Sequence, residues 1–140
     1  MESTPVKSTP ITITRLDLER LERLLETESI RALPGAGMLR EELGRANVVE
    51  PEEIGPDIIT MNSTARFVNE RTNTAYQMTL VYPNEAGTPG TVSVIAPVGS
   101  ALLGLSIGQT INWQVPGGRQ LRLRVVAVTS QPEAQKQFHR

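Results

Sequence analysis

The apolar positions along this chain repeat with two different periods, and the change between them divides the chain into two parts. Up to about residue 47 the apolar residues recur every three or four positions, the spacing of one face of a helix. From Asp57 onward they alternate with polar residues, which is the period of a half-buried strand. Helices first and strands afterwards predict an α+β protein.

The first helix is predicted over residues 14–28. Thr14 is a good N-cap, and Asp17 three positions later gives a variant of the capping box. The charged residues between the leucines, Asp17 among them, are expected on the solvent side. The apolar stripe of this helix consists of Leu18, Leu21 and Leu25, widened by Leu24.

A second amphipathic helix is predicted over residues 36–47, with Leu39 and Leu43 on one face. A break precedes it at Ala32-Leu33-Pro34-Gly35, where proline and glycine together indicate a turn. Two helices joined by such a short connection predict an antiparallel helical hairpin, a short coiled coil that forms an arm over residues 14–50. Residues 1–13 are expected to be an N-terminal extension.

The back of the chain predicts an antiparallel sheet of about five strands over residues 51–130, followed by a polar tail over 131–140 that frays. Asn62-Ser63 indicates a tight turn or a bulge, and Asn84 to Gly90 a hairpin loop. The strand regions are 57–67, 75–82, 91–96, 111–115 and 120–129.

A nearly all-apolar stretch, residues 95–108, lies between the strands. Pro97 suits the first turn of a helix, because its missing N–H would have no partner there. Gly104 and Gly108 can adopt positive φ and end the turn. A short apolar helix must be covered, and we expect the curved sheet to cover it. Its apolar positions at helical spacing are Val98, Ala101, Leu102 and Leu105.

The composition of the chain excludes several kinds of site and segment. The chain has 140 residues, 39% of them hydrophobic and 21% charged, which is ordinary for a soluble domain. It has no cysteine, which excludes disulfides and thiolate metal sites. Its longest apolar run is far short of the roughly 20 residues that span a bilayer. The start of the sequence has no apolar signal region, and we expect a bacterial cytoplasmic protein without a membrane association.

The charge is distributed unevenly. Residues 1–55 hold 7 Lys and Arg against 11 Asp and Glu, whereas residues 56–140 hold 7 against 4. Nucleic-acid binding favours dense basic residues and a high pI, so we expect no direct contact with nucleic acid. The asymmetry fits a protein partner, although two differently charged solvated faces would explain it equally well. Arg122 and Arg124, on one side of the last strand, carry the same two interpretations.

Several runs resemble a known family. Pro97, Leu102, Gly104 and the turn at 116–118 resemble the C-terminal domain of the Gre transcript-cleavage factors. The runs 58–63, 80–83, 96–99, 101–105 and 131–134 are more similar to the regulator of nucleoside diphosphate kinase (Rnk) family. The resemblance covers nearly the whole chain after Ile11.

The resemblance implies an FKBP-like sheet domain that docks on the rim of the RNA polymerase secondary channel and competes with Gre factors. In Gre factors a Ser-Pro turn at the start of the short helix belongs to the docking surface. Here Ala96 replaces that serine, and Pro97 is kept. We expect a monomer, with polymerase contacts made by Ile95, Ala96, Pro97, Val98 and Ser100.

The arm tip argues against catalysis. Gre factors hold Mg²⁺ with an acidic pair at the coiled-coil tip, and such ligands must approach the metal to about 2.1 Å. Here the tip offers Glu26, Glu28 and Arg31. Two glutamates two positions apart point about 200° apart around a helix and chelate poorly. The arm, roughly 20 Å long, also looks short for reaching a buried centre. We therefore expect no metal, no cofactor, no catalytic residue and no RNA cleavage.

Two other functions stay open. An adaptor that regulates nucleotide metabolism through another protein would fit the uneven charge. A prolyl isomerase would fit an FKBP-like fold, but the few aromatic residues lie mostly on strands, where core packing is the usual role. Kinase activity of the chain itself is not expected, because its one histidine is His139 and it has no phosphate-binding loop.

Overall fold

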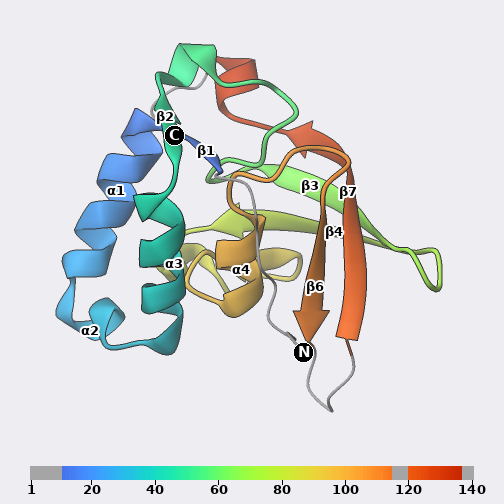
Figure 1. The fold of residues 1–140 in the computed structure, drawn as a ribbon, viewed down its shortest axis with the longest axis horizontal. Coiled ribbons are helices and arrows are strands. Elements are labelled where there is room, and N and C mark those ends of the chain that lie inside the picture. The colour runs from blue at the N-terminus through green and yellow to red at the C-terminus, as the bar shows by residue number, and fades with distance from the viewer. Residues whose placement is uncertain (1–10, 115–119, 137–140) are drawn as a thin grey trace.

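The computed structural model describes residues 11–114 and 120–136, apart from the side chains of residues 34, 97, 98, 112–114, 120 and 121. Three helical segments lie along one side of a curled sheet, and a short helix lies between them and the sheet (Figure 1). None of the described helices is long and apolar enough to cross a membrane. The chain is α+β, as the two periods of its sequence predict.

The front of the chain forms a helical hairpin whose two ends are tied together. Strand β1 pairs in parallel with β2, so the entry to the first helix lies beside the exit from the last. The two long helices run side by side in opposite directions (Figure 1). The elements are β1 (Thr12–Thr14), α1 (Arg15–Glu26), α2 (Glu28–Arg31), α3 (Pro34–Gly44) and β2 (Asn47–Val49).

Helix α1 begins where its N-cap predicts and ends early. The Thr14 hydroxyl accepts a hydrogen bond from the backbone N–H of Asp17 at 3.0 Å. The predicted end at residue 28 is wrong, because Thr27 is extended (ψ 132°) and α2 begins after it. A new, single-turn helix thus makes the tip of the hairpin.

The predicted break over residues 32–35 is confirmed at Ala32 and Leu33, which separate α2 from α3, but its last two residues belong to a helix. Pro34 is the first residue of α3, where the missing N–H costs nothing, and Gly35 follows inside the first turn. Gly35 is buried, and a Cβ at this position would overlap the carbonyl oxygen of Ile95. This glycine is needed for close backbone packing rather than for a turn.

The sheet has the strand order β5-β4-β3-β7-β6 and is mixed, not wholly antiparallel. Thr91 to Ser93 pairs in parallel with Thr79 to Val81. The predicted hairpin at 84–90 is therefore wrong. The loop, which contains the 3₁₀ turn η2 (Pro83–Glu85), runs back along β4, so that β5 starts beside Thr79 and continues in the same direction as β4. The strands are β3 (Thr64–Asn69), β4 (Thr74–Val81), β5 (Thr91–Ser93), β6 (Thr110–Gln114) and β7 (Gln120–Ser130).

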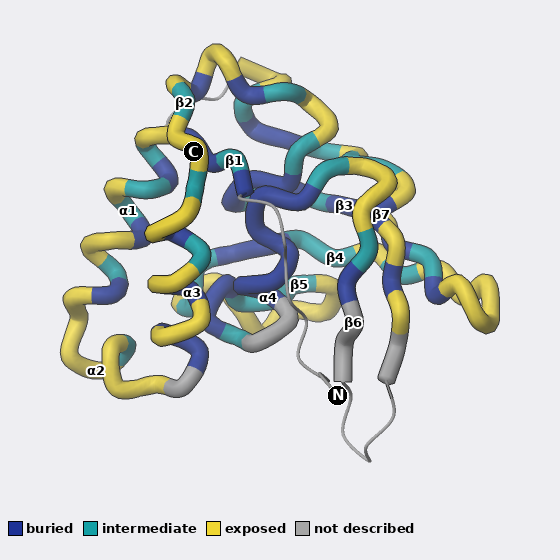
Figure 2. Tube along the Cα trace, viewed as in Figure 1, coloured by how far each residue is buried: buried dark blue, intermediate teal, exposed yellow. Residues whose placement is uncertain are grey.

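Helix α4 (Pro97–Leu102) lies at the centre of the core, and its cover differs from the expectation. The sheet covers only part of it, because α3 also packs against it. Figure 2 shows the buried positions concentrated around α4, whereas α2 and the far end of the β3–β4 hairpin are exposed. One apolar cluster contains residues from both parts of the chain: Leu21, Leu25 and Leu39 from the hairpin, Leu102 and Leu103 from the α4 region, and Phe67 and Val125 from the sheet.

Residues 131–136 pack against the domain, with Gln131 and Pro132 buried, contrary to the expectation that the chain frays from Gln131 onward. The Gln131 side-chain amide donates to the carbonyl oxygens of Gly55 and Ile58 at 2.8 and 2.7 Å. The 3₁₀ turn η3 (Glu133–Gln135) follows. These bonds attach the end of the chain to the segment between η1 (Pro51–Glu53) and β3.

Candidate functional site

The residues expected to dock on a partner form a tight turn between β5 and α4. The backbone N–H groups of Ile95 and Ala96 donate to the hydroxyl and the carbonyl oxygen of Ser93, at 3.1 and 3.0 Å. Ala96 is the N-cap of α4, and its carbonyl accepts from the Ser100 N–H at 3.0 Å. The backbone of this turn is thereby fixed on both sides of Pro97.

The predicted docking residues differ in exposure. Ile95 and Ser100 are buried, at 7% and 1% exposure. Ala96 is partly exposed, and the side chains of Pro97 and Val98 lie outside the part of the structure that is described. Ile95 and Ser100 are therefore placed to hold the turn in shape, and Ala96 is the described residue of the set whose side chain a partner can reach.

Close backbone contacts bring the start of α3 to this turn. Gly35 packs on the Ile95 carbonyl, and Gly99 packs on the Ser93 carbonyl in the same manner, since a Cβ at either glycine would overlap that oxygen. The first turn of α3 thus lies beside the 95–97 turn. Sequence reasoning missed this contact, and the available signal was a glycine placed just after a proline that begins a helix.

The arm tip exposes the three predicted residues on two separate helical segments. Glu26 is the last residue of α1, whereas Glu28 and Arg31 belong to α2. Because Thr27 between them is extended, Glu26 and Glu28 do not lie on one continuous helix. The expected separation of their side chains around a single helix therefore does not apply. Among the described residues no group of three His, Cys, Asp or Glu could hold a metal ion.

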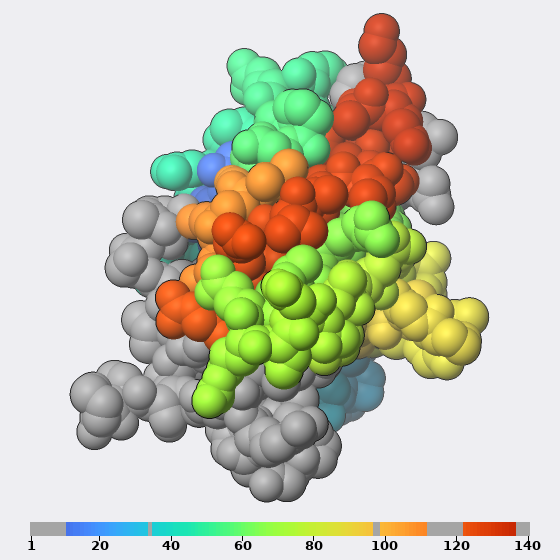
Figure 3. Space-filling model, turned by 90° about the vertical axis from the view of Figure 1, so that its right-hand side faces the viewer, coloured from blue at the N-terminus to red at the C-terminus, as the bar shows by residue number. Residues whose placement is uncertain are grey.

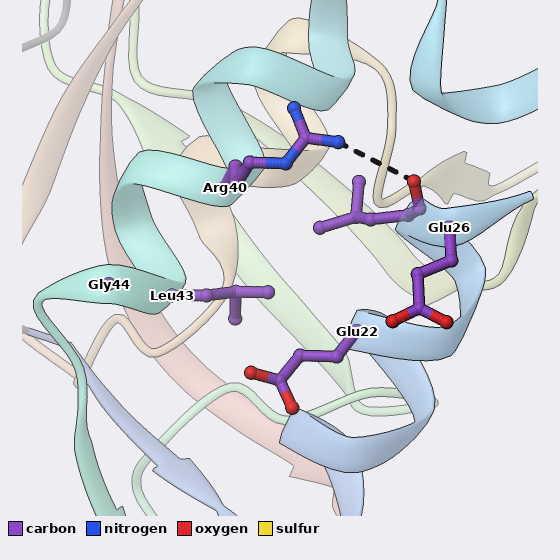
Figure 4. A pocket seen from close by; sticks show the side chains of 6 residues that line it. Glu22, Glu26, Arg40, Leu43 and Gly44 are labelled. Atoms are coloured by element: carbon purple, nitrogen blue, oxygen red, sulfur yellow. Dashed lines mark hydrogen bonds between the residues drawn. The ribbon is translucent and has the colours of Figure 1, made fainter.

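A hollow of about 470 Å³ lies between α1 and α3 (Figure 4). Glu22 and Glu26 extend from α1 toward α3, and Arg40 lies across from them. The Arg40 guanidinium donates to the carbonyl oxygen of Leu25, at 3.4 Å, near the end of α1. This bond joins α1 and α3 close to the tip. At its other contact α3 packs on the 95–97 turn through Gly35.

At the opposite end of α1, Asp17 is buried rather than solvated. It is 2% exposed, and its carboxylate accepts the backbone N–H of Met61 at 3.1 Å. In a capping box the Asp17 carboxylate would accept the backbone N–H of Thr14. Here it accepts the N–H of Met61, in the turn before β3. Burial, reinforced by the negative charge of Glu133, raises the pKa of Asp17 to about 7.

The turn that receives Asp17 is also held by the end of the chain. The Thr60 hydroxyl donates to the Glu133 carboxylate at 2.7 Å and lies 2.8 Å from the Ser63 hydroxyl. Asn62 has a positive φ of 67°, which confirms the predicted tight turn. Arm, sheet domain and C-terminal segment therefore meet at residues 60–63.

Two family comparisons divide the chain near residue 50. Residues 9–49 match the Rnk N-terminus family, and residues 54–130 match the family of the C-terminal domain of the transcription elongation factors GreA and GreB. The boundary between the two matches falls between β2 and β3, where the helical hairpin gives way to the sheet.

Similar proteins match this chain over different lengths. The regulator of nucleoside diphosphate kinase of Escherichia coli (strain K12) is 45% identical over 125 residues, which cover 89% of this chain and 92% of that protein. A GreA of Chlorobium phaeobacteroides (strain BS1) is 33% identical over 85 residues, 59% of this chain and 53% of GreA. A solved structure described as a prokaryotic transcription elongation factor GreA/GreB, from Nitrosomonas europaea, is 50% identical with a TM-score of 0.77, and the match covers 88% of this chain and all of that one.

Proposed function

Since this chain belongs to the Rnk family, with a C-terminal part from the GreA/GreB domain family, we propose that it regulates transcription by binding RNA polymerase without cleaving RNA. The proposed site is the rim of the secondary channel, where it would compete with Gre-type factors. The observation that carries the proposal is the fixed turn at Ser93 to Ser100, which lies beside the start of α3 in a Gre-like fold.

A preorganised turn is suited to docking. Because both flanks of Pro97 are hydrogen-bonded within the turn, binding does not have to order this backbone first. Ala96 supplies a small, partly exposed side chain that a partner surface can approach closely. Ile95 and Ser100 are buried and hold the turn against the core.

The arm supports binding rather than cleavage. Helix α1 has 12 residues, about 18 Å at 1.5 Å per residue, and much of its apolar face is buried against the rest of the molecule. Hard cations such as Mg²⁺ need converging oxygen ligands. Among the residues that the structure describes, no group of three His, Cys, Asp or Glu could hold such an ion, and this includes the tip glutamates Glu26 and Glu28. We therefore expect the arm to occupy the channel entrance sterically.

The decisive test is binding of the purified chain to core RNA polymerase, with a Gre factor as competitor. We expect mutually exclusive binding. Ala96→Arg adds a large charged side chain at the proposed contact and is expected to weaken binding at least tenfold. Ala134→Arg is the matched control, because Ala134 is exposed on η3 and belongs to the segment after β7.

Three results would contradict the proposal: no binding at micromolar concentration, simultaneous binding of the Gre factor, or equal affinities for Ala96→Arg and the wild type. In a stalled elongation complex, the chain is expected to leave the RNA intact under conditions in which the Gre factor shortens it. Shortened RNA would contradict only the proposed absence of RNA cleavage, not the proposed binding to polymerase. A partner other than polymerase, captured through the same turn, would favour the adaptor function instead.

A further inference from the structure

The outer face of the sheet, opposite the helices, carries a group of arginines that the proposed function does not use. We call it the basic sheet face: Arg66 and Val68 on β3, Ala75 on the neighbouring strand β4, and Arg122 and Arg124 on β7. Arg66, Ala75, Arg122 and Arg124 are exposed, and Val68 is partly exposed. Figure 3 looks onto this face, where β3, β4 and β7 are in front.

The strand pairing places these residues together. Arg124 is the direct partner of Val68, whose partner on the other side is Ala75. Arg66 lies two positions before Val68 on β3, on the same face of the sheet, and pairs with Ala127 on β7 because the register shifts between Arg66 and Phe67. Two arginines therefore flank a small apolar centre formed by Val68 and Ala75.

The charge of this face is unbalanced. Of the five Lys and Arg residues in the described part of the chain after residue 55, the face holds three, and a fourth, Arg71, lies at the nearby β3–β4 turn. The acidic residue that contacts the face is Glu70, whose carboxylate lies 3.2 Å from Arg122 Nε and 3.5 Å from Arg124 Nε.

Glu70 orients these two arginines without using up their donors. A guanidinium has five N–H donors, and each contact with Glu70 engages Nε. The terminal nitrogens stay available to donate to a carboxylate in bidentate geometry. Arg66, on the other side of Val68, has no ion pair within the described structure. The face is therefore a partly preorganised receptor for negative charge.

We propose that the basic sheet face binds an acidic helical segment of a protein partner. Carboxylates one turn apart on a helix have Cβ atoms about 5–6 Å apart, a spacing that the long side chains of Arg66 and Arg124 can reach. An apolar side chain between those carboxylates would cover Val68 and Ala75. Arginine around a small apolar centre is also the composition typical of protein interfaces.

The same features disfavour nucleic acid. Single strands bind to sheets by stacking bases on aromatic side chains, and the aromatic residues of the described central strands, Phe67 and Tyr76, pack on the core side. Duplex binding depends on many phosphate contacts, whereas this face has three arginines, two of which already contact Glu70.

The test uses a fluorescent 18-residue helical peptide with Glu at i and i+4 around a Leu, and a matched peptide with Gln in place of Glu. We expect the full-length protein to bind the Glu peptide at least tenfold more tightly at 50 mM salt, with the difference decreasing at 300 mM. The double variant Arg66→Gln/Arg124→Gln is expected to lose this preference. The matched control is Arg23→Gln/Arg31→Gln, which removes two exposed charges from the arm.

Four outcomes would overturn the proposal: no binding of the Glu peptide by the wild type up to 1 mM, equal binding of the two peptides, an equal loss in the arm control, or tighter binding of a 20-base-pair DNA duplex that depends on Arg66 and Arg124. Circular dichroism of the variants establishes that they are folded. Polymerase does not take part in this experiment, so its result is independent of the proposed docking at Ala96.

Discussion

The two ends of helix α1 carry carboxylates in opposite environments. At its first turn Asp17 is 2% exposed, bonded to Met61 and close to Glu133. At its last turn Glu26 is exposed, and Glu28 beyond it is exposed as well. The same functional group thus fixes the arm to the domain at one end and remains available to a partner at the other.

This difference indicates how much of the arm lies outside the contacts with the rest of the protein. The apolar residues of α1 and α3 belong to the same core as the sheet, and Arg40 joins the two helices near the tip. Gly35 places α3 directly on the turn proposed to dock. The arm is therefore part of the globular body along much of its length, and its exposed residues lie at the tip and on the outer sides of α1 and α3.

The largest effect is expected where the arm packs on the docking turn. Gly35→Val would force side-chain atoms into the Ile95 carbonyl, and α3 would have to move away from α4. We expect a loss of about 5 kcal/mol in the free energy of unfolding, measured by urea denaturation. Gly37→Ala is the control on the same helix, because its Cβ meets nothing within 4 Å. It is expected to stabilise by about 0.5–1 kcal/mol. Equal effects of the two changes would contradict the close contact.

An intermediate effect is expected at the buried end of α1, and it depends on pH. In the folded protein the pKa of Asp17 is about 7, whereas the ordinary pKa of the group is 3.8, so between these pH values the folded state holds a proton that the unfolded state releases. The stability contributed by this proton is complete below pH 3.8 and is lost as the pH rises to about 7. A shift of this size limits the loss to about 4 kcal/mol.

Asp17→Asn cannot release that proton. Its unfolding free energy, relative to the wild type, is therefore expected to increase between pH 4 and 7 in urea denaturation. Glu22→Gln, an exposed change on the same helix, is the control and should follow the wild-type profile. Parallel profiles for Asp17→Asn and the wild type would show that the Asp17 pKa is not raised by folding.

The smallest effect is expected at the tip. Glu28→Gln removes an exposed carboxylate at the start of a single-turn helix, and we expect a change below about 0.5 kcal/mol in the free energy of unfolding. Thermal denaturation at constant pH measures it. A loss comparable to that at Gly35 would mean that the tip, like the other end of α1, is structural.

Local signals in the sequence predicted much of the fold. Thr14 caps α1, Pro97 begins α4, and the β4 and β7 regions lie close to their predicted positions. Gly104 and Gly108 adopt the expected positive φ. The docking turn and the arm tip were proposed from sequence and stay predictions, and the burial of Ile95 and Ser100 and the contact with α3 were not foreseen.

The errors have a common cause. Asp17 was assigned to the solvent side because its capping partner is local, whereas its actual donor, Met61 N–H, lies 44 positions away. Gly35 was interpreted as a turn because its neighbour is a proline, whereas its role is to admit the Ile95 carbonyl. The parallel pairing of β5 depends on the path of a loop whose composition is that of any hairpin.

By itself, then, the sequence determined what each segment does with its own backbone: its period, its caps and its breaks are set by neighbours within one or two turns. Only the tertiary structure decided which surfaces meet. Burial of Asp17, the mixed sheet and the joining of the arm to the docking turn arise from contacts between distant segments. Their free energies depend on fit across an interface, and no local pattern of residues encodes that fit.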